Sequence, residues 1–194
     1  NNKIIKYKTQ RRDVLMRKRG FEVVSKYKDK NINLPKRATK GSAGYDIESA
    51  EDITIPSIWK TFYSTLFQYF GDKNGTWEEY KQKIAKAIKP ILVPTGLKAY
   101  MQEDEVLKLH NRSSNPLKRG LILSNGIGIV DSDYYNNKST EGHIMAQFVN
   151  IFPFDIKIKK GERICQGIFE QYLLTDDDTA EGERTGGHGS TNDK

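Results

Sequence analysis

Two carboxylates close a short apolar stretch near the middle of this 194-residue sequence. β-Branched residues favour a strand, and glycine lets the backbone approach a ligand closely. Two aspartates at a spacing of two could bind a metal ion, polarise a water molecule or form an Asx turn, and the stretch alone leaves these alternatives open. The stretch reads Gly126-Ile127-Gly128-Ile129-Val130-Asp131-Ser132-Asp133-Tyr134-Tyr135.

Four further stretches are marked by glycines or charged residues, and the last of them has the residue types that a phosphate site needs. An arginine can hold a phosphate through two parallel hydrogen bonds, and serine hydroxyls are short donors. A glycine-rich segment can present backbone N–H groups as an anion nest, although such a tail alone is more often a disordered end. In chain order the stretches are Ala43-Gly44-Tyr45-Asp46, Arg112-Ser113-Ser114, Gly161-Glu162-Arg163-Ile164-Cys165-Gln166, and Arg184 to Thr191.

Short strands are the elements that must position these residues. Many brief apolar or alternating runs separated by turn residues are typical of a β-sandwich or barrel, so we expect a mainly β, jelly-roll-like fold. Residues 175–183 are acidic and have little to bury, so we expect a β domain at 1–174 and a flexible arm at 175–194. Strands are predicted at residues 21–24, 52–56, 91–94, 97–101, 106–109, 121–123, 143–150, 155–159 and 164–173.

Residues 56–90 interrupt the β pattern with helical signals. Ser57 can cap a first helix, and Thr76 with Glu79 forms the capping box of a second. The window holds 8 of the 20 aromatic residues. We therefore predict an inserted helical hairpin whose aromatic side chains pack on each other and on the domain. The alternative hypothesis is a surface that binds a protein partner.

Charge is distributed unevenly along the chain. Residues 1–40 carry 14 basic and 3 acidic side chains, whereas the whole chain has a net charge of +7, so the remainder is net negative. A basic segment could bind nucleic acid, but only Tyr7, Phe21 and Tyr27 could supply stacking there, and we favour a solvated surface.

The single cysteine and the hydropathy limit the classes of protein. Cys165 excludes an intramolecular disulfide and, with isoleucine neighbours, is expected to be a buried thiol in a reducing, cytoplasmic setting. There is no run of 18 apolar residues and no secretory signal pattern, so we expect no membrane association.

In their order, the five stretches closely resemble the five motifs of the trimeric dUTPase family, over about residues 34–192 without the insertion. The resemblance implies a homotrimer with three active sites. One subunit gives the first, second and fourth motifs, its neighbour the third, and the remaining subunit the C-terminal arm. The implied reaction hydrolyses dUTP to dUMP and pyrophosphate with Mg²⁺, and we interpret the source as a phage or prophage.

The resemblance also assigns roles to individual residues. Asp131 would polarise the attacking water, and Asp46 would hold waters of the Mg²⁺ shell rather than the metal itself. Tyr134 would pack beneath the deoxyribose and leave no room for a 2′-hydroxyl. The other assignments are Arg112, Ser113, Ser114 and Gln166 at the phosphates, Asn125, Gly128, Val130 and Met145 at the uracil, and Arg184, His188, Gly189, Ser190 and Thr191 in the closing arm.

Some features depart from the family pattern. His188 stands where the arm usually presents a phenylalanine, and residues 136–142 extend the loop after Tyr134, as in some phage and Gram-positive relatives. A dCTP deaminase shares the fold and an Arg-Ser-Ser motif, but the run from Asp131 to Tyr134 and the glycine-rich arm favour the diphosphatase. A further alternative is a regulatory role in which residues 56–90 bind a partner.

Overall fold

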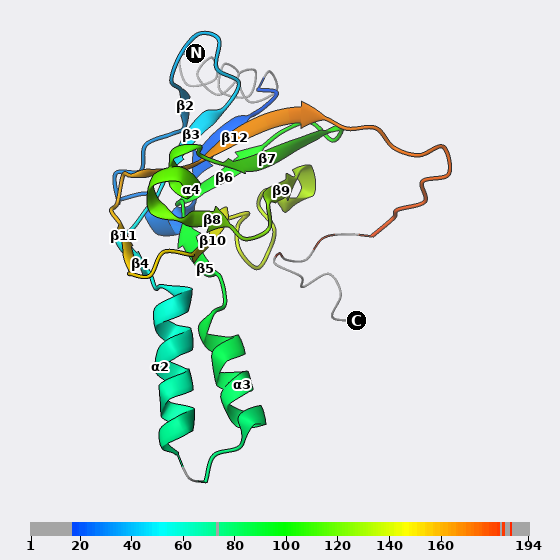
Figure 1. The fold of residues 1–194 in the computed structure, drawn as a ribbon. Coiled ribbons are helices and arrows are strands. Elements are labelled where there is room, and N and C mark those ends of the chain that lie inside the picture. Colours follow the sequence, from blue (N-terminus) through cyan, green and yellow to red (C-terminus); the bar gives the residue numbers. More distant parts are fainter. Residues whose placement is uncertain (1–16, 73, 183, 185–186, 188–194) are drawn as a thin grey trace, which may run out of the picture.

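A five-stranded antiparallel sheet organises the fold (Figure 1). The computed structural model describes residues 17–72, 74–182, 184 and 187. Inward-facing residues such as Ile47, Leu107 and Leu109 are almost fully buried, because alternate strand residues point to the core. The strand order is β2 (Lys36–Arg37), β3 (Tyr45–Glu48), β12 (Arg163–Gln171), β7 (Glu105–Asn111) and β9 (Ile127–Asp131).

Three smaller antiparallel sheets complete the β domain. One apolar cluster, which includes Phe148, Ile164 and Leu121, runs between the sheets and forms the core. The prediction of a mainly β, jelly-roll-like fold is therefore confirmed. The smaller sheets are β5 (Ile91–Pro94) with β10 (Met145–Asn150) and β8 (Leu121–Leu123), β11 (Ile156–Ile158) with β4 (Ile53–Ile55), and β1 (Gly20–Val23) with β6 (Leu97–Tyr100).

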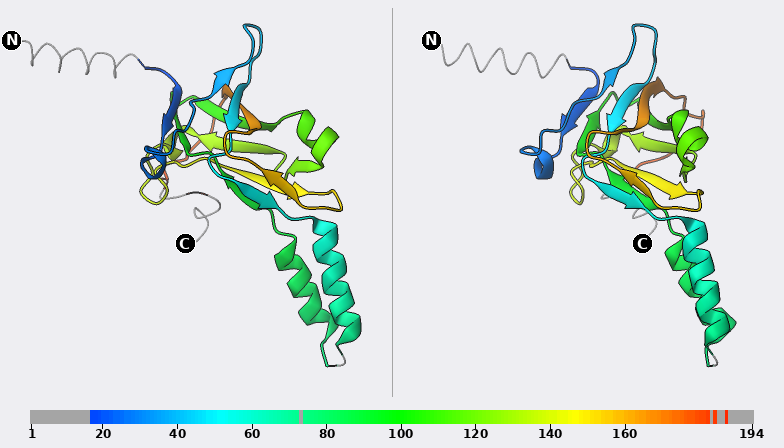
Figure 2. Two further views of the ribbon diagram at one scale, coloured as in Figure 1. Left: turned by 90° about the vertical axis from the view of Figure 1, so that its left-hand side faces the viewer. Right: turned by 60° about the vertical axis from the view of Figure 1, so that its left-hand side comes forward.

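The predicted helical hairpin is present and projects from the β domain (Figures 1 and 2). It consists of α2 (Ile58–Gly71) and α3 (Trp77–Ala87). The Ser57 side chain accepts a hydrogen bond from the Lys60 N–H. Both bonds of the predicted Thr76–Glu79 capping box are formed, so the local sequence determines where each helix begins.

The predicted aromatic packing is present in the hairpin, although one face of α2 stays largely exposed. Trp59 stacks on Tyr63 with ring centroids 6.4 Å apart, and its Nε1 donates to the Ile151 carbonyl of the β domain at 2.9 Å. Tyr69 packs against Trp77 and Tyr80, with ring centroids 5.4 and 5.3 Å apart. The opposite face of α2 is exposed because the hairpin stands away from the sheets, which could otherwise cover it (Figure 2). That face, the α2 aromatic stripe, consists of Trp59, Tyr63, Phe67 and Phe70, which are 46–75% exposed.

Some elements were not predicted. Residues 114–119 form a short helix, α4 (Ser114–Arg119), and the 3-10 turns η1 (Ser25–Tyr27) and η2 (Ser132–Tyr134) follow β1 and β9. Pro116 is compatible with α4 because it lies in the first turn, where its missing N–H needs no helical partner. Within the described ranges, no helix is long and apolar enough to cross a bilayer.

Candidate active site

One cavity, here called the β9 cavity, brings together seven of the predicted site residues. It has a volume of about 200 Å³ and lies where β9 turns into η2. Gly128 faces Leu109 of β7 closely, and a Cβ atom at this position would lie 3.1 Å from the Leu109 side chain, a tight contact that would require a small shift. The predicted residues in its wall are Asn125, Gly128, Val130, Asp131, Tyr134, Met145 and Arg184.

The register of β9 determines which of its side chains enter the core. Val130 lies opposite Leu107 of β7 and is 7% exposed, whereas Ile127 and Ile129 point outwards and are 45% and 56% exposed. The strand ends at Asp131, whose side chain is 44% exposed. The backbone therefore delivers this carboxylate to the cavity rim, where water can reach it.

Arg184 forms ion pairs with both carboxylates of the central stretch. Its Nε donates to Asp133 Oδ1 at 2.8 Å, and its terminal nitrogen contacts Asp131. The guanidinium also lies 5.8 Å from the centre of the Tyr134 ring. The expected arm arginine thus reaches the β9 cavity of its own chain. His188, Gly189, Ser190 and Thr191 lie outside the described residues.

A second group of polar side chains, the Asp46 cluster, surrounds the nearly buried carboxylate of Asp46. The Arg163 guanidinium lies 3.1 Å from one Asp46 oxygen, and Arg112 Nε lies 3.5 Å from the other. The Gln166 amide donates to Asp46 at 3.4 Å. Three of the predicted residues therefore meet here. They are joined by Arg163, which was not predicted as a site residue although it lies in the stretch from Gly161 to Gln166.

The turn before α4 presents the two predicted serines beside Arg112. Ser113 is the N-cap residue and makes no side-chain capping bond, so its hydroxyl is not used by the helix. The buried Asn115 amide donates to the Ile164 carbonyl at 2.7 Å and thereby ties α4 to β12. Asn115 is a positioning residue that no sequence signal indicated.

The Asp46 cluster fits a water-mediated metal role better than direct coordination. Mg²⁺ usually keeps several waters and binds one or two carboxylates together with phosphate oxygens. Among the residues that the structure describes, no group of three or more histidine, cysteine or carboxylate side chains could hold a metal ion. A lone carboxylate facing two arginines suits the outer shell of a phosphate-bound Mg²⁺.

The two groups of site residues lie far apart in one chain. Asp46, Gln166, His110 and Ile127 lie opposite one another on four adjacent strands, and Asp131 lies four residues further along β9. Standard strand spacing and rise then place the Cα atoms of Asp46 and Asp131 roughly 20 Å apart. Within one chain, the β9 cavity and the Asp46 cluster are therefore two separate groups of residues.

The thiol of Cys165 belongs to the core. It is fully buried, and burial raises its pKa to about 12. A protonated, inaccessible thiol is not a nucleophile, so the prediction of a structural cysteine is confirmed.

Comparisons with known proteins agree on one family. A family model described as dUTPase matches residues 79–191. The deoxyuridine 5'-triphosphate nucleotidohydrolase of Lactococcus lactis subsp. lactis (strain IL1403) is 46% identical over 178 residues, which are 91% of this chain and 99% of that protein. The protein of the same name from Treponema denticola is 30% identical over 88% of this chain and 98% of its own length.

Solved structures give the same match at the level of the fold. A dUTPase from Streptococcus mutans aligns with a TM-score of 0.62 and 42% identity, over 81% of this chain and 98% of that one. A mutant form of the dUTPase of Staphylococcus bacteriophage 80alpha aligns with a TM-score of 0.57 and 18% identity, over 86% and 90% of the two chains. The second similarity shows a shared fold alone.

Proposed function

The chain belongs to the dUTPase family and is a dUTP nucleotidohydrolase, and from this premise we propose that Asp131 polarises the water that attacks the α-phosphorus of dUTP. The position of Asp131 supports this role. Its carboxylate lies at the rim of the β9 cavity, is partly exposed, and ends a strand anchored to β7. An aligned water and charge relief on the phosphates are what such a hydrolysis needs.

The β9 cavity is the proposed binding site for uracil and deoxyribose. Backbone groups of Gly128 and Val130, with Met145 on β10 and the Asn125 side chain, would recognise the base edge. Cytosine would present a donor where uracil has an acceptor and would leave a buried group unpaired, which is costly. Tyr134 would pack beneath the sugar and exclude a 2′-hydroxyl.

The Asp46 cluster is the proposed binding site for the triphosphate. Arg112, Ser113, Ser114 and Gln166 would contact phosphate oxygens, since a planar guanidinium and short hydroxyl donors match them. Asp46 would orient waters in the shell of Mg²⁺, which reduces the charge on the triphosphate when it is bound. Arg184 and the arm residues His188, Gly189, Ser190 and Thr191 would close the site.

We further propose a homotrimer with shared active sites. The separation of Asp131 from Asp46 within one chain supports it, because a second subunit must bring the missing half. The exposed Ile127 and Ile129, next to Asp131, are apolar side chains that a neighbour can cover. Beside Ile127, the buried Nε2 atom of His110 has no hydrogen-bond partner among the described residues.

A single cysteine without a disulfide supports action in the cytoplasm.

Pyrophosphate release tests the catalytic assignment. The parent protein should hydrolyse dUTP and leave dTTP, dCTP and UTP nearly untouched. Asp131→Asn should lower kcat by about 100-fold or more, because the polarising carboxylate is lost. Asp133→Asn is the matched comparison, since it neutralises the other carboxylate that binds Arg184. An equal loss from both substitutions would contradict the special role of Asp131.

The alternative of a dCTP deaminase finds no support, because the family model and the named relatives are dUTPases. The same reactions check it directly. Ammonia release from dCTP without pyrophosphate release from dUTP would reverse the conclusion.

A second candidate function is protein binding by the hairpin, favoured by the exposure of the α2 aromatic stripe. Replacing Phe67 and Phe70 with serine should leave dUTP hydrolysis unchanged, since both lie on the projecting hairpin. A partner-binding role predicts that the same variant loses a protein captured from host lysate by the parent. Capture that is identical for parent and variant would contradict this role.

A further inference from the structure

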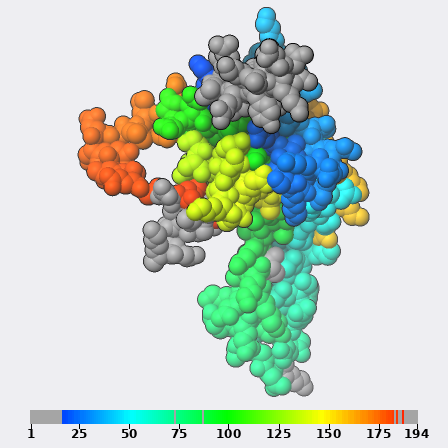
Figure 3. Space-filling model, turned by 180° about the vertical axis from the view of Figure 1, so that it is seen from behind, coloured from blue at the N-terminus to red at the C-terminus, as the bar shows by residue number. Residues whose placement is uncertain are grey.

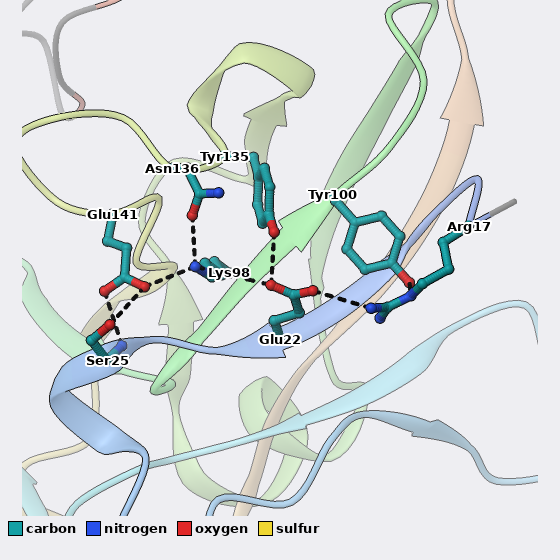
Figure 4. Close-up of polar contacts among 8 residues, drawn as sticks. All are labelled: Arg17, Glu22, Ser25, Lys98, Tyr100, Tyr135, Asn136 and Glu141. Carbon is teal, nitrogen blue, oxygen red and sulfur yellow. Dashed lines mark hydrogen bonds and ion pairs between the residues drawn. The ribbon is translucent and has the colours of Figure 1, made fainter. Parts of the chain in front are cut away.

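The loop at residues 135–142 folds back onto β6 through Lys98 (Figure 4). The Lys98 side chain is only 10% exposed. Its ammonium donates to Asn136 Oδ1 at 2.6 Å and to Glu141 Oε1 at 2.8 Å. One cation therefore binds both ends of the loop. A nearly buried ammonium requires such partners, since desolvation would otherwise strongly destabilise it.

The two loop residues that bind Lys98 have an unusual backbone conformation. Asn136 has φ of 56° and Glu141 has φ of 58°, in the left-handed region that side chains other than glycine rarely adopt. Such conformations persist only where surrounding contacts impose them, and they are frequent at functional sites. The contacts from Lys98 are therefore placed where the loop most needs support.

The N-terminal segment supports the same loop from the other side. The Ser25 N–H and hydroxyl both donate to Glu141, at 2.9 and 3.1 Å. The Tyr135 hydroxyl donates to Glu22 of β1 at 2.7 Å. Figure 3 shows the blue segment that contains β1 and η1 packed beside the yellow-green segment that contains this loop, on the face opposite to that of Figure 1. The loop is therefore held between β1, η1 and β6.

Hydrogen bonds inside the loop lead directly to Tyr134. The buried Asn137 amide donates to the Tyr134 carbonyl at 2.8 Å. Thr140 Oγ1 donates to the Tyr134 hydroxyl at 3.2 Å, and that hydroxyl donates to the His143 carbonyl at 3.0 Å. Tyr134 is 8% exposed and forms part of the wall of the β9 cavity. Its ring position is thus fixed by the folded shape of the loop.

We propose that Lys98 is a positioning residue for substrate discrimination: it holds loop 135–142 in the shape that fixes Tyr134, and thereby contributes to the rejection of UTP. This inference rests on the proposed function, in which Tyr134 packs beneath the deoxyribose. Lys98 itself touches no part of the cavity. It acts through Asn136 and Glu141, and then through Asn137 and Thr140.

The test compares kcat/KM for dUTP with kcat/KM for UTP in the full-length protein. Lys98→Met keeps the length of the side chain and removes the ammonium. The dUTP-to-UTP ratio should fall about tenfold, the size expected when hydrogen bonds to a charged group are lost. A variant that is merely less folded loses active sites for both substrates equally, so its ratio does not change.

Two further variants keep the test decisive. Glu141→Gln retains the shape of the side chain but removes one charge from the pair. It should lower the dUTP-to-UTP ratio less than Lys98→Met does. It also replaces Lys98→Met as the test variant if Lys98→Met does not fold. Lys159→Met removes an exposed lysine that pairs with Asp52 at 2.7 Å, and should leave the ratio unchanged.

The outcomes separate this inference from the function on which it rests. Tyr134→Leu belongs in the same series and should also lower the ratio. If the dUTP-to-UTP ratio falls in Tyr134→Leu but is unchanged in Lys98→Met, the role of Lys98 alone is overturned. If Lys98→Met does not fold, an unchanged ratio in Glu141→Gln has the same meaning. An unchanged ratio in Tyr134→Leu overturns the role of Tyr134 and, with it, the inference.

Discussion

Asp46 is a nearly buried carboxylate whose charge is balanced by two guanidinium groups. Arg163 approaches it from β12 and Arg112 from the turn that follows β7, and Arg163 is the more exposed of the two arginines. In the proposed function, both cations would be held in place before a phosphate binds, which would reduce the entropy lost on binding. The same contacts fix the orientation of the Asp46 carboxylate.

We therefore expect Arg163 to contribute to substrate binding in the proposed function. Arg163→Gln should raise KM for dUTP by roughly threefold to tenfold with a smaller change in kcat, because exposed ion pairs contribute about 1 kcal/mol. Steady-state kinetics with dUTP measure both parameters. Arg119→Gln is the comparison, since Arg119 pairs with Glu162 outside the cluster. An equal effect of the two substitutions would argue against a specific role for Arg163.

The ion pair of Lys98 and Glu141 makes stability depend on pH. The hydrogen bond from Lys98 lowers the pKa of Glu141 from 4.5 to about 2. A lowered folded-state pKa gives stability that is present above pH 4.5 and is lost as the pH falls towards 2. Glu141→Gln should therefore show a smaller drop in Tm between about pH 5 and about pH 3 than the parent. Parallel Tm curves for the two proteins would contradict this assignment.

At the level of elements, the capping residues identify the start of each hairpin helix. Thr76→Ala removes the side-chain acceptor of the capping box and should destabilise the hairpin by about 1 kcal/mol. Hydrogen exchange of the α3 amides should become faster. The kcat for dUTP should stay unchanged, because the hairpin lies outside the β9 cavity and the Asp46 cluster. Unchanged exchange would show that packing on α2 alone determines the stability of α3.

Local patterns predicted most of the strands and both long helices, because alternation and caps are properties of neighbouring residues. They did not predict β2, β3 or α4. Ser113, Ser114, Asn115 and Pro116 are residue types typical of turns, and the helix depends on the buried Asn115 bond to Ile164. The contact of Arg163 with Asp46 depends on the pairing of β12 with β3, which joins residues over 100 positions apart. The resemblance assigned the candidate site residues but gave no indication of Lys98.

At the scale of the whole molecule, the two groups of candidate site residues lie on different strands of one sheet. Asp131 lies on edge strand β9, and Asp46 lies three strands away on β3. In the proposed homotrimer, a closed ring of identical subunits would bring each Asp131 to a neighbour's Asp46 cluster by a single repeated contact. The sheet order is therefore the observation on which the proposal of shared sites rests.

Mixing two inactive variants tests this division. Asp131→Asn and Arg112→Met should each be nearly inactive alone. After co-refolding in equal amounts, about one quarter of the shared sites should combine an intact Asp131 from one chain with an intact Arg112 from another. Recovery of pyrophosphate release towards that level supports shared sites. No recovery, with mixed oligomers confirmed by mass spectrometry, would mean that each chain builds its site alone.

The hairpin leaves and re-enters the β domain along the same side of a single strand, β10, opposite to the side that pairs with β8. Ser57 bridges to Asn150 at one end of β10, and Ile91 pairs with Phe148 two residues away. Because both junctions are secured by main-chain pairing, the intervening segment can vary in length or identity at little entropic cost. This location is therefore a suitable insertion site for protein engineering. A fluorescent reporter or an affinity tag could replace the helices while nucleotide turnover continues.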